Sequence, residues 1–379
     1  MNKKPSVLFM YPGQTRTLRL PAIQTGEAPK EFFYGYTYLR DQGYKVAIGD
    51  NRQDPATAYG KTILYYERLR NRALNFGFTS SRVMALADQI SAYDIALSFT
   101  DFFSLSMGLY RHHIKGGAKL VGGFHGLSDL IDRVNPALRG YARTRILKAI
   151  FGLDHLFFSG EVDREVAIEM YGIPRQKTSY FPFGVDTDFW HPSQSPSPHH
   201  GILSVGSDPS RDFASLISAD VEENIRIITR LNIAAPTHRP NVEIIRGSLN
   251  NSPITDVSLR TLYQNSKIVV VPLKDVWQPT GCSVTLQAMA CAKPVIISHI
   301  KGLWDADILK SGENCLLVPP GDPQALSQAI HDLQKDPALR KRIGQEARKT
   351  AERNFTLSRM ENALETMLLA MPPKGQNRA

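Results

Sequence analysis

A glycine turn followed by an arginine stands out in the second half of the chain. Residues 204–213 read SVGSDPSRDF, in which a strand-like run ends at Gly206 and Arg211 precedes the next helical stretch. Glycine lets the backbone approach a ligand closely, and the arginine guanidinium has a fork geometry that suits phosphate oxygens. The pattern predicts an anion site, although an arginine before a helix is more often a surface charge.

A second glycine turn precedes another helix. Residues 279–290 read PTGCSVTLQAMA, and a helix is expected to begin near Ser283. The unpaired N–H groups of a first helical turn, together with the helix dipole, form an anion site. Gln287 follows one turn later. A capped core helix is the alternative, because most side chains of this segment are apolar. The expected anion ligands are the free N–H groups of that first turn.

Alternating strand-like and helix-like segments must position these residues, a pattern typical of α/β folds with parallel sheets. A helix is expected over Glu31–Gln42, and a Pro/Ser-rich run, HPSQSPSPHH at 191–200, marks a linker. Strands are expected at Ser6–Tyr11, Lys45–Asp50, Asp94–Phe99, Lys119–Phe124, His155–Ser159 and Thr178–Phe183, and after the linker at Ile202–Gly206, Ile225–Thr229, Val242–Arg246, Ile268–Leu273, Pro294–Ser298 and Cys315–Pro319.

The second series ends in helices expected at Pro323–Lys335, Pro337–Asn354 and Leu357–Ala370. Two Rossmann-like, doubly wound domains are therefore expected to face each other across a cleft, with the ligand at the carboxyl ends of the strands. The expected boundaries are 1–190 for an acceptor-binding domain, 191–200 for the linker and 201–355 for a nucleotide-sugar-binding domain. Residues 356–379 would form a helix that crosses back to the first domain, and a tail.

The charge of the chain restricts its partners. The formal net charge is +9, and the stretch from Arg111 to Lys148 carries eight bases against two acids. Such a field attracts an anionic lipid surface, a phosphorylated acceptor or nucleic acid, or is simply a solvated basic face. No nucleic-acid recognition motif accompanies the charge, so nucleic acid is not expected.

Cysteine content and hydropathy indicate the compartment. The three cysteines, Cys282, Cys291 and Cys315, have neither metal-ligand spacing nor obvious pairing, which fits a reducing cytosol. Neither a signal peptide nor a membrane-spanning run is recognisable. A cytoplasmic protein is expected, with peripheral contact at the inner face of the membrane as an option.

Four segments, taken in order, resemble one enzyme family. Besides the two glycine turns there are FGVDTDFW at 183–190 and SGENCLLVPPGDP at 311–323. Together they are similar to the motifs of the retaining glycosyltransferases of the GT-B fold, family 4, over roughly Ser159–Phe355. The N-terminal half resembles that family through its strand order, the turn at Gly13, and His125 after a strand.

The resemblance implies transfer of a sugar from a nucleoside diphosphate sugar, UDP- or GDP-linked, with retention at the anomeric carbon and without a metal or other cofactor. The acceptor would be a glycan, a lipid-linked molecule or a small molecule. Arg211 matches a family lysine that neutralises the leaving diphosphate, and His125 would donate a hydrogen bond to the sugar or the leaving phosphate. The donor-binding residues would be Gly13, Gly206, Ser207, Arg211, Gln278, Gly281, Cys282, Ser283, Val284 and Gln287.

The chain departs from the family pattern at three positions. Ser207 stands where a second diphosphate-binding arginine is usual. Gln287 replaces the glutamate that grips the ribose hydroxyls, and Gln278 lies near the place of another glutamate. Gln287→Glu is expected to be tolerated, because it restores the family residue. The alternative function is a catalytically inactive nucleotide-sugar-binding protein.

Two Asp-x-Asp strings suggest a metal site, since other glycosyltransferases hold a divalent ion this way. Asp186 and Asp188 fall inside the FGVDTDFW motif, and Asp305 and Asp307 fall on an expected helix. Both strings are interpreted as coincidence, and no metal site is expected. The segments Gln14–Lys30 and Asn51–Asn75 are interpreted as loops that face the acceptor.

Overall fold

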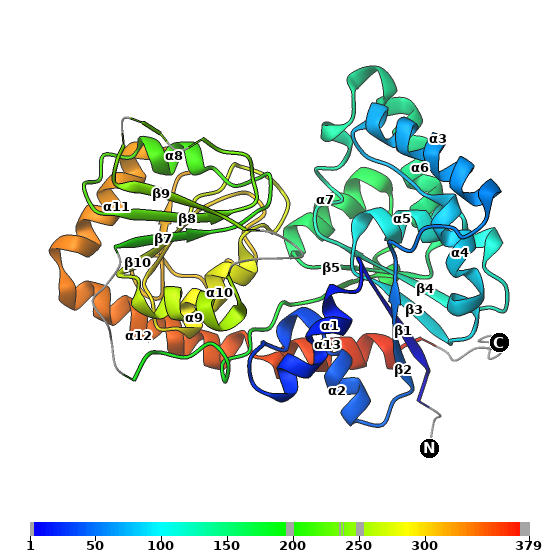
Figure 1. The fold of residues 1–379 in the computed structure, drawn as a ribbon, viewed down its shortest axis with the longest axis horizontal. Helices are drawn as coiled ribbons and strands as arrows, with labels where there is room; N and C mark the ends of the chain where they lie inside the picture. The colour runs from blue at the N-terminus through cyan, green and yellow to red at the C-terminus, as the bar shows by residue number, and fades with distance from the viewer. Residues whose placement is uncertain (1–3, 195–200, 235, 238, 248–253, 372–379) are drawn as a thin grey trace. The chain divides into compact units, whose positions relative to one another are not determined.

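The structure is a computed structural model that describes residues 4–194, 201–234, 236–237, 239–247 and 254–371. The chain divides into two compact units. The first comprises Met1–Leu20, Phe33–Pro182 and Glu361–Ala379, and the second comprises Pro21–Phe32 and Phe183–Met360. Each unit contains a six-stranded sheet whose strand pairings are all parallel (Figure 1). The expected α/β fold with two Rossmann-like domains is confirmed.

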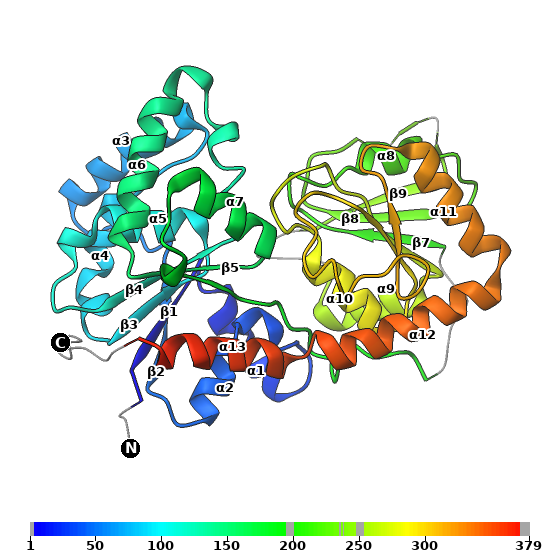
Figure 2. The ribbon, with the colours of Figure 1, turned by 180° about the vertical axis from the view of Figure 1, so that it is seen from behind.

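The sheet of the first unit has the strand order β2-β1-β3-β4-β5-β6. Its central strands are apolar and fully buried, as expected for a parallel sheet covered on both faces. Helices lie on both sides of this sheet (Figures 1 and 2). The strands are β1 (Val7–Tyr11), β2 (Val46–Asp50), β3 (Ile95–Ser98), β4 (Lys119–Phe124), β5 (His155–Phe158) and β6 (Thr178–Tyr180).

The helices of the first unit follow its strands in alternation. The helix α1 (Thr15–Gln24) continues past the unit boundary at Pro21, and α13 (Leu357–Leu369) belongs to this unit from Glu361 onward. The other helices are α2 (Tyr36–Asp41), α3 (Ala58–Leu74), α4 (Ser80–Ser91), α5 (Asp101–Leu109), α6 (Arg139–Gly152) and α7 (Glu161–Tyr171).

The sheet of the second unit has the order β12-β11-β10-β7-β8-β9. The strands are β7 (Ile202–Val205), β8 (Ile225–Thr229), β9 (Val242–Arg246), β10 (Ile268–Val271), β11 (Val295–Ser298) and β12 (Leu316–Val318). The helices are α8 (Phe213–Ser218), α9 (Asp256–Asn265), α10 (Cys282–Ala290), α11 (Pro323–Lys335) and α12 (Pro337–Asn354).

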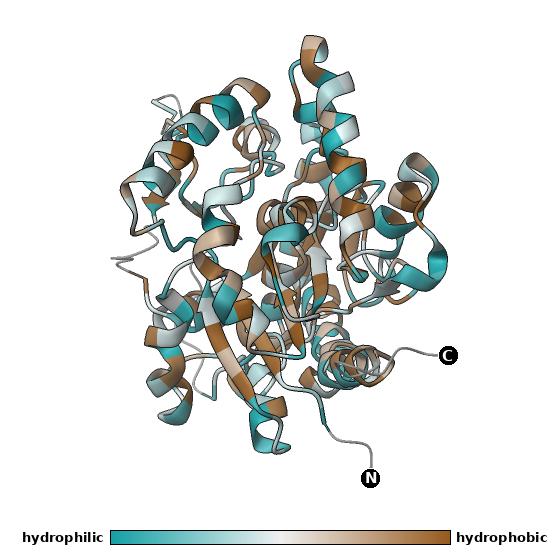
Figure 3. Cartoon of the chain, turned by 90° about the vertical axis from the view of Figure 1, so that its right-hand side faces the viewer, coloured by the Kyte–Doolittle hydropathy of each residue, from teal (hydrophilic) through white to brown (hydrophobic). Residues whose placement is uncertain are grey.

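Alternate residues of the strands supply two separate cores in the second unit. In β10, Val269 and Val271 pack with residues of α9, α10 and α12, whereas Ile268 and Val270 pack with residues of α8 and α11. This follows from the two-residue period of a strand. Much of the strand length is accordingly coloured as hydrophobic in Figure 3.

Four of the expected elements differ from the structure. The helix expected over Glu31–Gln42 is divided into a 3₁₀ turn at Glu31–Phe33 and α2, with Gly35 left-handed between them. A Cβ at Gly35 would lie 2.6 Å from Leu364 Cδ2 of α13, so tertiary packing requires glycine there. The helix expected at Asp305 is a series of turns, and the loops expected at 14–30 and 51–75 contain α1 and α3.

The compact units also differ from the expected domain boundaries. Residues 183–190 and Pro21–Phe32 pack in the second unit, although both were expected in the first domain. From Glu361 onward, the last helix belongs to the first unit. Residues 195–200 of the expected linker and 372–379 of the expected tail lie outside the described residues.

Candidate functional site

Arg211 lies at the point where the strand order of the second sheet reverses. It follows β7, and its backbone bridges to Leu273, which follows the neighbouring strand β10. In open α/β sheets, ligands bind outside the carboxyl ends of strands at such a switch point. The topology therefore places this cation where a ligand is expected.

The Arg211 side chain is buried without full pairing. It is 6% exposed, and its Nε and Nη1 atoms have no hydrogen-bond partner. Burial lowers its pKa to about 10, with opposing contributions from Asp208 and Tyr263, so the group remains charged at neutral pH. A buried, unpaired guanidinium is costly, and an anionic ligand would supply the missing acceptors.

Two glycines make room for this guanidinium. A Cβ at Gly206 would lie 2.1 Å from Arg211 Nε, and a Cβ at Gly281 would lie 3.4 Å from Nη1. The side chain therefore lies against both glycine turns. Two motifs that are far apart in the sequence meet at one cation.

The N-terminus of α10 lies at the same place. Gly281 has φ 83° and is the N-cap, and no side chain caps this helix end. The N–H groups of Cys282 and Ser283 begin the helix, and the side chain of Val284 packs in the core. The donor-binding roles of these three residues stay predictions. Burial raises the pKa of the Cys282 thiol well above its usual range, which disfavours the thiolate form.

Ser207 and Gln278 have partners within the surrounding loops. The Ser207 hydroxyl accepts a hydrogen bond from the Arg230 backbone N–H at 3.0 Å. The Gln278 amide donates to Asp208 Oδ2 at 3.1 Å. These contacts fix the loops beside Arg211, and the donor-binding roles of both residues stay predictions.

Gln287 is 2% exposed, and both ends of its amide are bonded. Its Oε1 accepts from the Tyr263 hydroxyl at 3.3 Å, and its Nε2 donates to Glu31 Oε1 at 3.1 Å. Sequence reasoning missed Glu31, because it lies in the segment Pro21–Phe32, which packs in the second unit although it precedes most of the first. A lone glutamate 256 residues away from its partner gives no sequence signal.

Glu31 is a fully buried carboxylate. It also accepts from the Trp190 indole N–H at 2.7 Å and from the Asp186 backbone N–H at 3.3 Å. Burial raises its pKa to about 7, although these hydrogen bonds lower it in part. The polar groups Tyr263, Gln287, Glu31 and Trp190 thus form a continuous chain inside the second unit.

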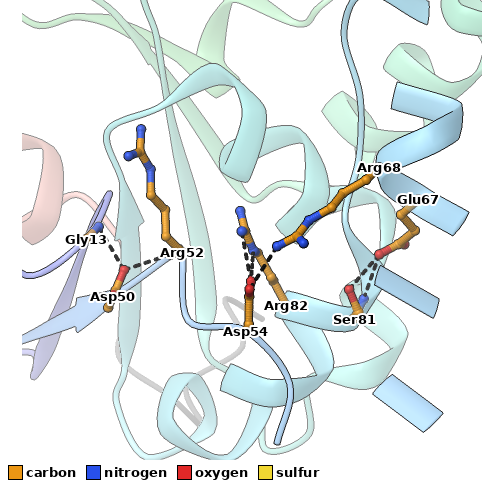
Figure 4. Close-up of polar contacts among 8 residues, drawn as sticks. All are labelled: Gly13, Asp50, Arg52, Asp54, Glu67, Arg68, Ser81 and Arg82. Atoms are coloured by element: carbon orange, nitrogen blue, oxygen red, sulfur yellow. Dashed lines mark hydrogen bonds and ion pairs between the residues drawn. The ribbon is translucent and has the colours of Figure 1, made fainter. Parts of the chain in front are cut away.

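The predicted site residues of the first unit are all paired. Gly13 has φ 78°, and its N–H donates to Asp50 Oδ1 at 2.8 Å (Figure 4). The His125 Nε2 donates to the Phe99 carbonyl at 3.2 Å, and Nδ1 lies 2.8 Å from the Ser159 hydroxyl. Because a carbonyl can only accept, a neutral His125 carries its proton on Nε2 and accepts from Ser159.

Two parts of the chain match known protein families. Residues 252–350 match the family described as Glycosyl transferases group 1, and residues 36–189 match Glycosyltransferase Family 4. The two matches cover parts of both halves of the chain. Both halves of the chain are thus similar to glycosyltransferases.

The curated relatives of the chain are distant. A D-inositol 3-phosphate glycosyltransferase of Streptomyces bingchenggensis is 33% identical over 101 residues, which are 27% of this chain and 21% of the relative. The chain spans about half the length, or less, of the first curated relatives that it matches.

Solved glycosyltransferase structures share the whole fold. The Anabaena protein HepE in complex with UDP and glucose has a TM-score of 0.65 at 14% identity, covering 97% of this chain and 100% of its own. The sucrose-phosphate synthase of Thermosynechococcus elongatus has a TM-score of 0.67 at 16% identity, covering 96% and 98%. At this identity the likeness establishes the GT-B fold and nothing finer.

One aspartate of each Asp-x-Asp string has structural contacts. Asp186 accepts backbone N–H groups of Lys30 and Phe189, and Asp305 pairs with Arg359. Within the described part of the chain, no group of three or more metal-ligating side chains is suited to hold an ion. A search of the same residues finds no helix long and apolar enough to cross a membrane.

Proposed function

We propose that the chain transfers a sugar from a UDP- or GDP-linked donor to a glycan, lipid-linked or small-molecule acceptor, with retention and without a metal ion. The observation that carries this proposal is Arg211, a buried cation with unpartnered nitrogens beside the uncapped N-terminus of α10. The leaving diphosphate gains negative charge as the glycosidic bond breaks. A preorganised cation and a helix N-terminus stabilise that charge.

These groups account for the chemistry that a divalent ion performs elsewhere. The Arg211 fork can bind two phosphate oxygens, and the first-turn N–H groups of α10 can bind others. His125 would donate a hydrogen bond to the sugar or the phosphate once it exchanges its bond to the Phe99 carbonyl. Retention rests on the family resemblance, and the anomeric configuration of the product, measured by NMR, tests it.

UDP-linked donors are the first to try, because the HepE structure contains UDP. A panel of UDP- and GDP-linked sugars, scored by thermal shift and by slow hydrolysis, tests the donor class. Stabilisation by a nucleoside diphosphate and donor turnover support a transferase. If no nucleotide sugar binds, the proposal is wrong.

A nucleotide-sugar-binding protein without turnover is the second candidate. The observation that favours it is Gln287, an amide where the family has a carboxylate, with both of its ends already bonded. Donor binding without turnover, for every acceptor and for water, would support this candidate and exclude the transferase.

We further infer cytoplasmic action at an anionic surface. The exposed face of α3 carries Tyr59, Tyr66 and Leu69, which are 75%, 66% and 50% exposed, and the only acid of this helix, Glu67, is buried. Lys61 and Arg72 are exposed on the same helix. Aromatic and basic residues together favour an anionic membrane interface. Cosedimentation with vesicles containing phosphatidylglycerol, compared with neutral vesicles, tests this contact.

A further inference from the structure

Glu31 is an uncompensated carboxylate in the interior of the second unit. It is 0% exposed, and none of the ion pairs between described residues includes it. Among the described residues, Trp190, Gln287 and Asp186 each donate an N–H to this carboxylate. An arrangement this costly needs a reason, because neutral residues could fill the same space.

The residue type at position 287 follows from this carboxylate. The Gln287 amide nitrogen lies 3.1 Å from Glu31 Oε1. A glutamate at 287 would place two carboxylates in one buried site, and one of them would have to be protonated. The amide instead donates to Glu31 without adding charge. The expectation that Gln287→Glu is tolerated is therefore replaced by its opposite.

The pair is connected to the diphosphate site. A glutamine amide has two N–H donors and two acceptor lone pairs. Glu31 takes one donor and Tyr263 takes one lone pair, which fixes the amide. A glutamine amide can make one further donor and one further acceptor contact. Gln287 is six residues beyond Gly281, about 9 Å along α10. That distance is comparable to the separation of diphosphate and ribose hydroxyls in a nucleotide.

We propose that Glu31 is a positioning residue of the nucleotide site. It supplies the carboxylate that α10 lacks, and it holds the Gln287 amide so that its remaining donor and acceptor meet the vicinal hydroxyls of the ribose. In the family pattern a single glutamate at this position of the helix binds the ribose hydroxyls. Here Gln287 would contact them and Glu31 would supply the carboxylate that holds Gln287. This inference rests on the proposed function, because it requires the diphosphate at Arg211.

The test compares E31Q, Q287E and the exchanged pair E31Q/Q287E with the wild type. UDP, GDP, ADP and inorganic pyrophosphate are titrated by calorimetry, and Tm is measured for each variant. The matched control is E67Q in the first unit, which removes another buried carboxylate. That carboxylate accepts hydrogen bonds from Ser80 and from Ser81, and Figure 4 shows its contact with Ser81. R211A serves as the reference for the diphosphate site.

We expect E31Q to weaken binding of the preferred nucleoside diphosphate about 5- to 50-fold and to leave pyrophosphate within about twofold, because pyrophosphate has no ribose. Q287E should weaken the nucleotide likewise and lower Tm by roughly 5 °C or more at pH 8. The exchanged pair should recover both values to near wild type. E67Q should lower Tm without changing the ratio of the two affinities.

Three results would overturn the inference: unchanged nucleotide binding in E31Q, equal losses for nucleotide and pyrophosphate, or an exchanged pair no better than Q287E. Pyrophosphate binding that R211A does not weaken would instead refute the diphosphate site and the proposed function. A wild type that binds none of the probes would refute both proposals.

Discussion

In the first unit, the polar groups that follow β1 and β4 are bonded to their neighbours: Gly13 to Asp50, and His125 to Phe99 and Ser159. In the second unit, Arg211 follows β7 with two buried nitrogens unpartnered, and the first turn of α10 has no side-chain cap. Both sets lie at the carboxyl ends of parallel strands. The difference indicates that the polar groups of the first unit stabilise the fold, whether or not they also bind a ligand. The polar groups of the second unit lack hydrogen-bond partners until a ligand supplies them.

The largest effect is expected for Arg211→Ala. Transfer should fall about 10²–10³-fold, because the leaving diphosphate loses a charge-assisted contact. Tm without ligand should stay unchanged or rise, because the variant removes a buried, unpaired charge. Steady-state kinetics and thermal unfolding measure the two effects.

Arg239 provides the matched control in the same unit. Its guanidinium donates to the carbonyls of Ile217, Ala219 and Val221 at 2.8–3.1 Å. Arg239→Ala should lower Tm and leave diphosphate binding by the folded protein intact. If the two variants behave alike, an unpartnered cation does not distinguish the ligand site.

The second effect concerns the pH dependence of stability through Glu31. Its folded pKa of about 7 is above the ordinary value of 4.5, so the folded state binds this proton more tightly than the unfolded state. Stability should therefore fall as pH rises from about 4.5 to 7, by on the order of 3 kcal/mol in the limit, and then level off. Tm of the wild type relative to E31Q, measured across this range, should decline with pH.

The difference in Tm between the wild type and E31Q separates the effect of Glu31 from that of another carboxylate with a raised pKa. Asp163 of the first unit, hydrogen bonded to Ser128, also has a pKa raised to about 7 by burial, and it is present in both proteins. Asp186 lies beside Glu31 and contributes to its raised pKa, and it too is unchanged by the substitution. A difference in Tm that does not vary with pH would show that Glu31 is ionised in the fold at all these values.

His125→Ala should have a smaller effect on transfer than Arg211→Ala. The loss of one neutral hydrogen bond is worth about 1 kcal/mol, or roughly five- to tenfold in rate. Tm should also fall, because Ser159 and the Phe99 carbonyl lose their partner. Ser159→Ala is the control that releases the ring without removing it. If H125A loses as much transfer as R211A while its Tm is unchanged, His125 serves the reaction and not the fold. The comparison drawn between the two units would then be wrong.

The smallest effect is expected for metal removal. Transfer rates in EDTA should stay within about twofold of the untreated rate, because Arg211 and the α10 N-terminus supply the neutralising charge. If transfer is lost in EDTA and recovers with Mn²⁺ or Mg²⁺, a divalent ion neutralises the leaving diphosphate, and Arg211 with the α10 N-terminus does not suffice.

The sequence by itself determined the strands and the order of the motifs. Continuous apolar runs such as Ile268–Val271 and Val295–Ser298 can only be buried, so their pattern predicts a parallel sheet without knowledge of the partner strands. Helix starts were equally local: Asp322 and Asp336 each cap a helix that begins with proline. The glycine turns at Gly206 and Gly281 could be predicted from the sequence as well, because the backbone conformation of a turn depends on the residue types within it.

Only the tertiary structure decided which side chains are paired. The division of the segment expected to be a helix at Glu31–Gln42 depends on Leu364, and the meaning of Gln287 depends on Glu31. The residues around Gly35 and around Gln287 give no indication of contact partners that are hundreds of residues away in the sequence. Pairing of buried charges is set by the packing of distant segments, because desolvation acts on whatever the fold brings together.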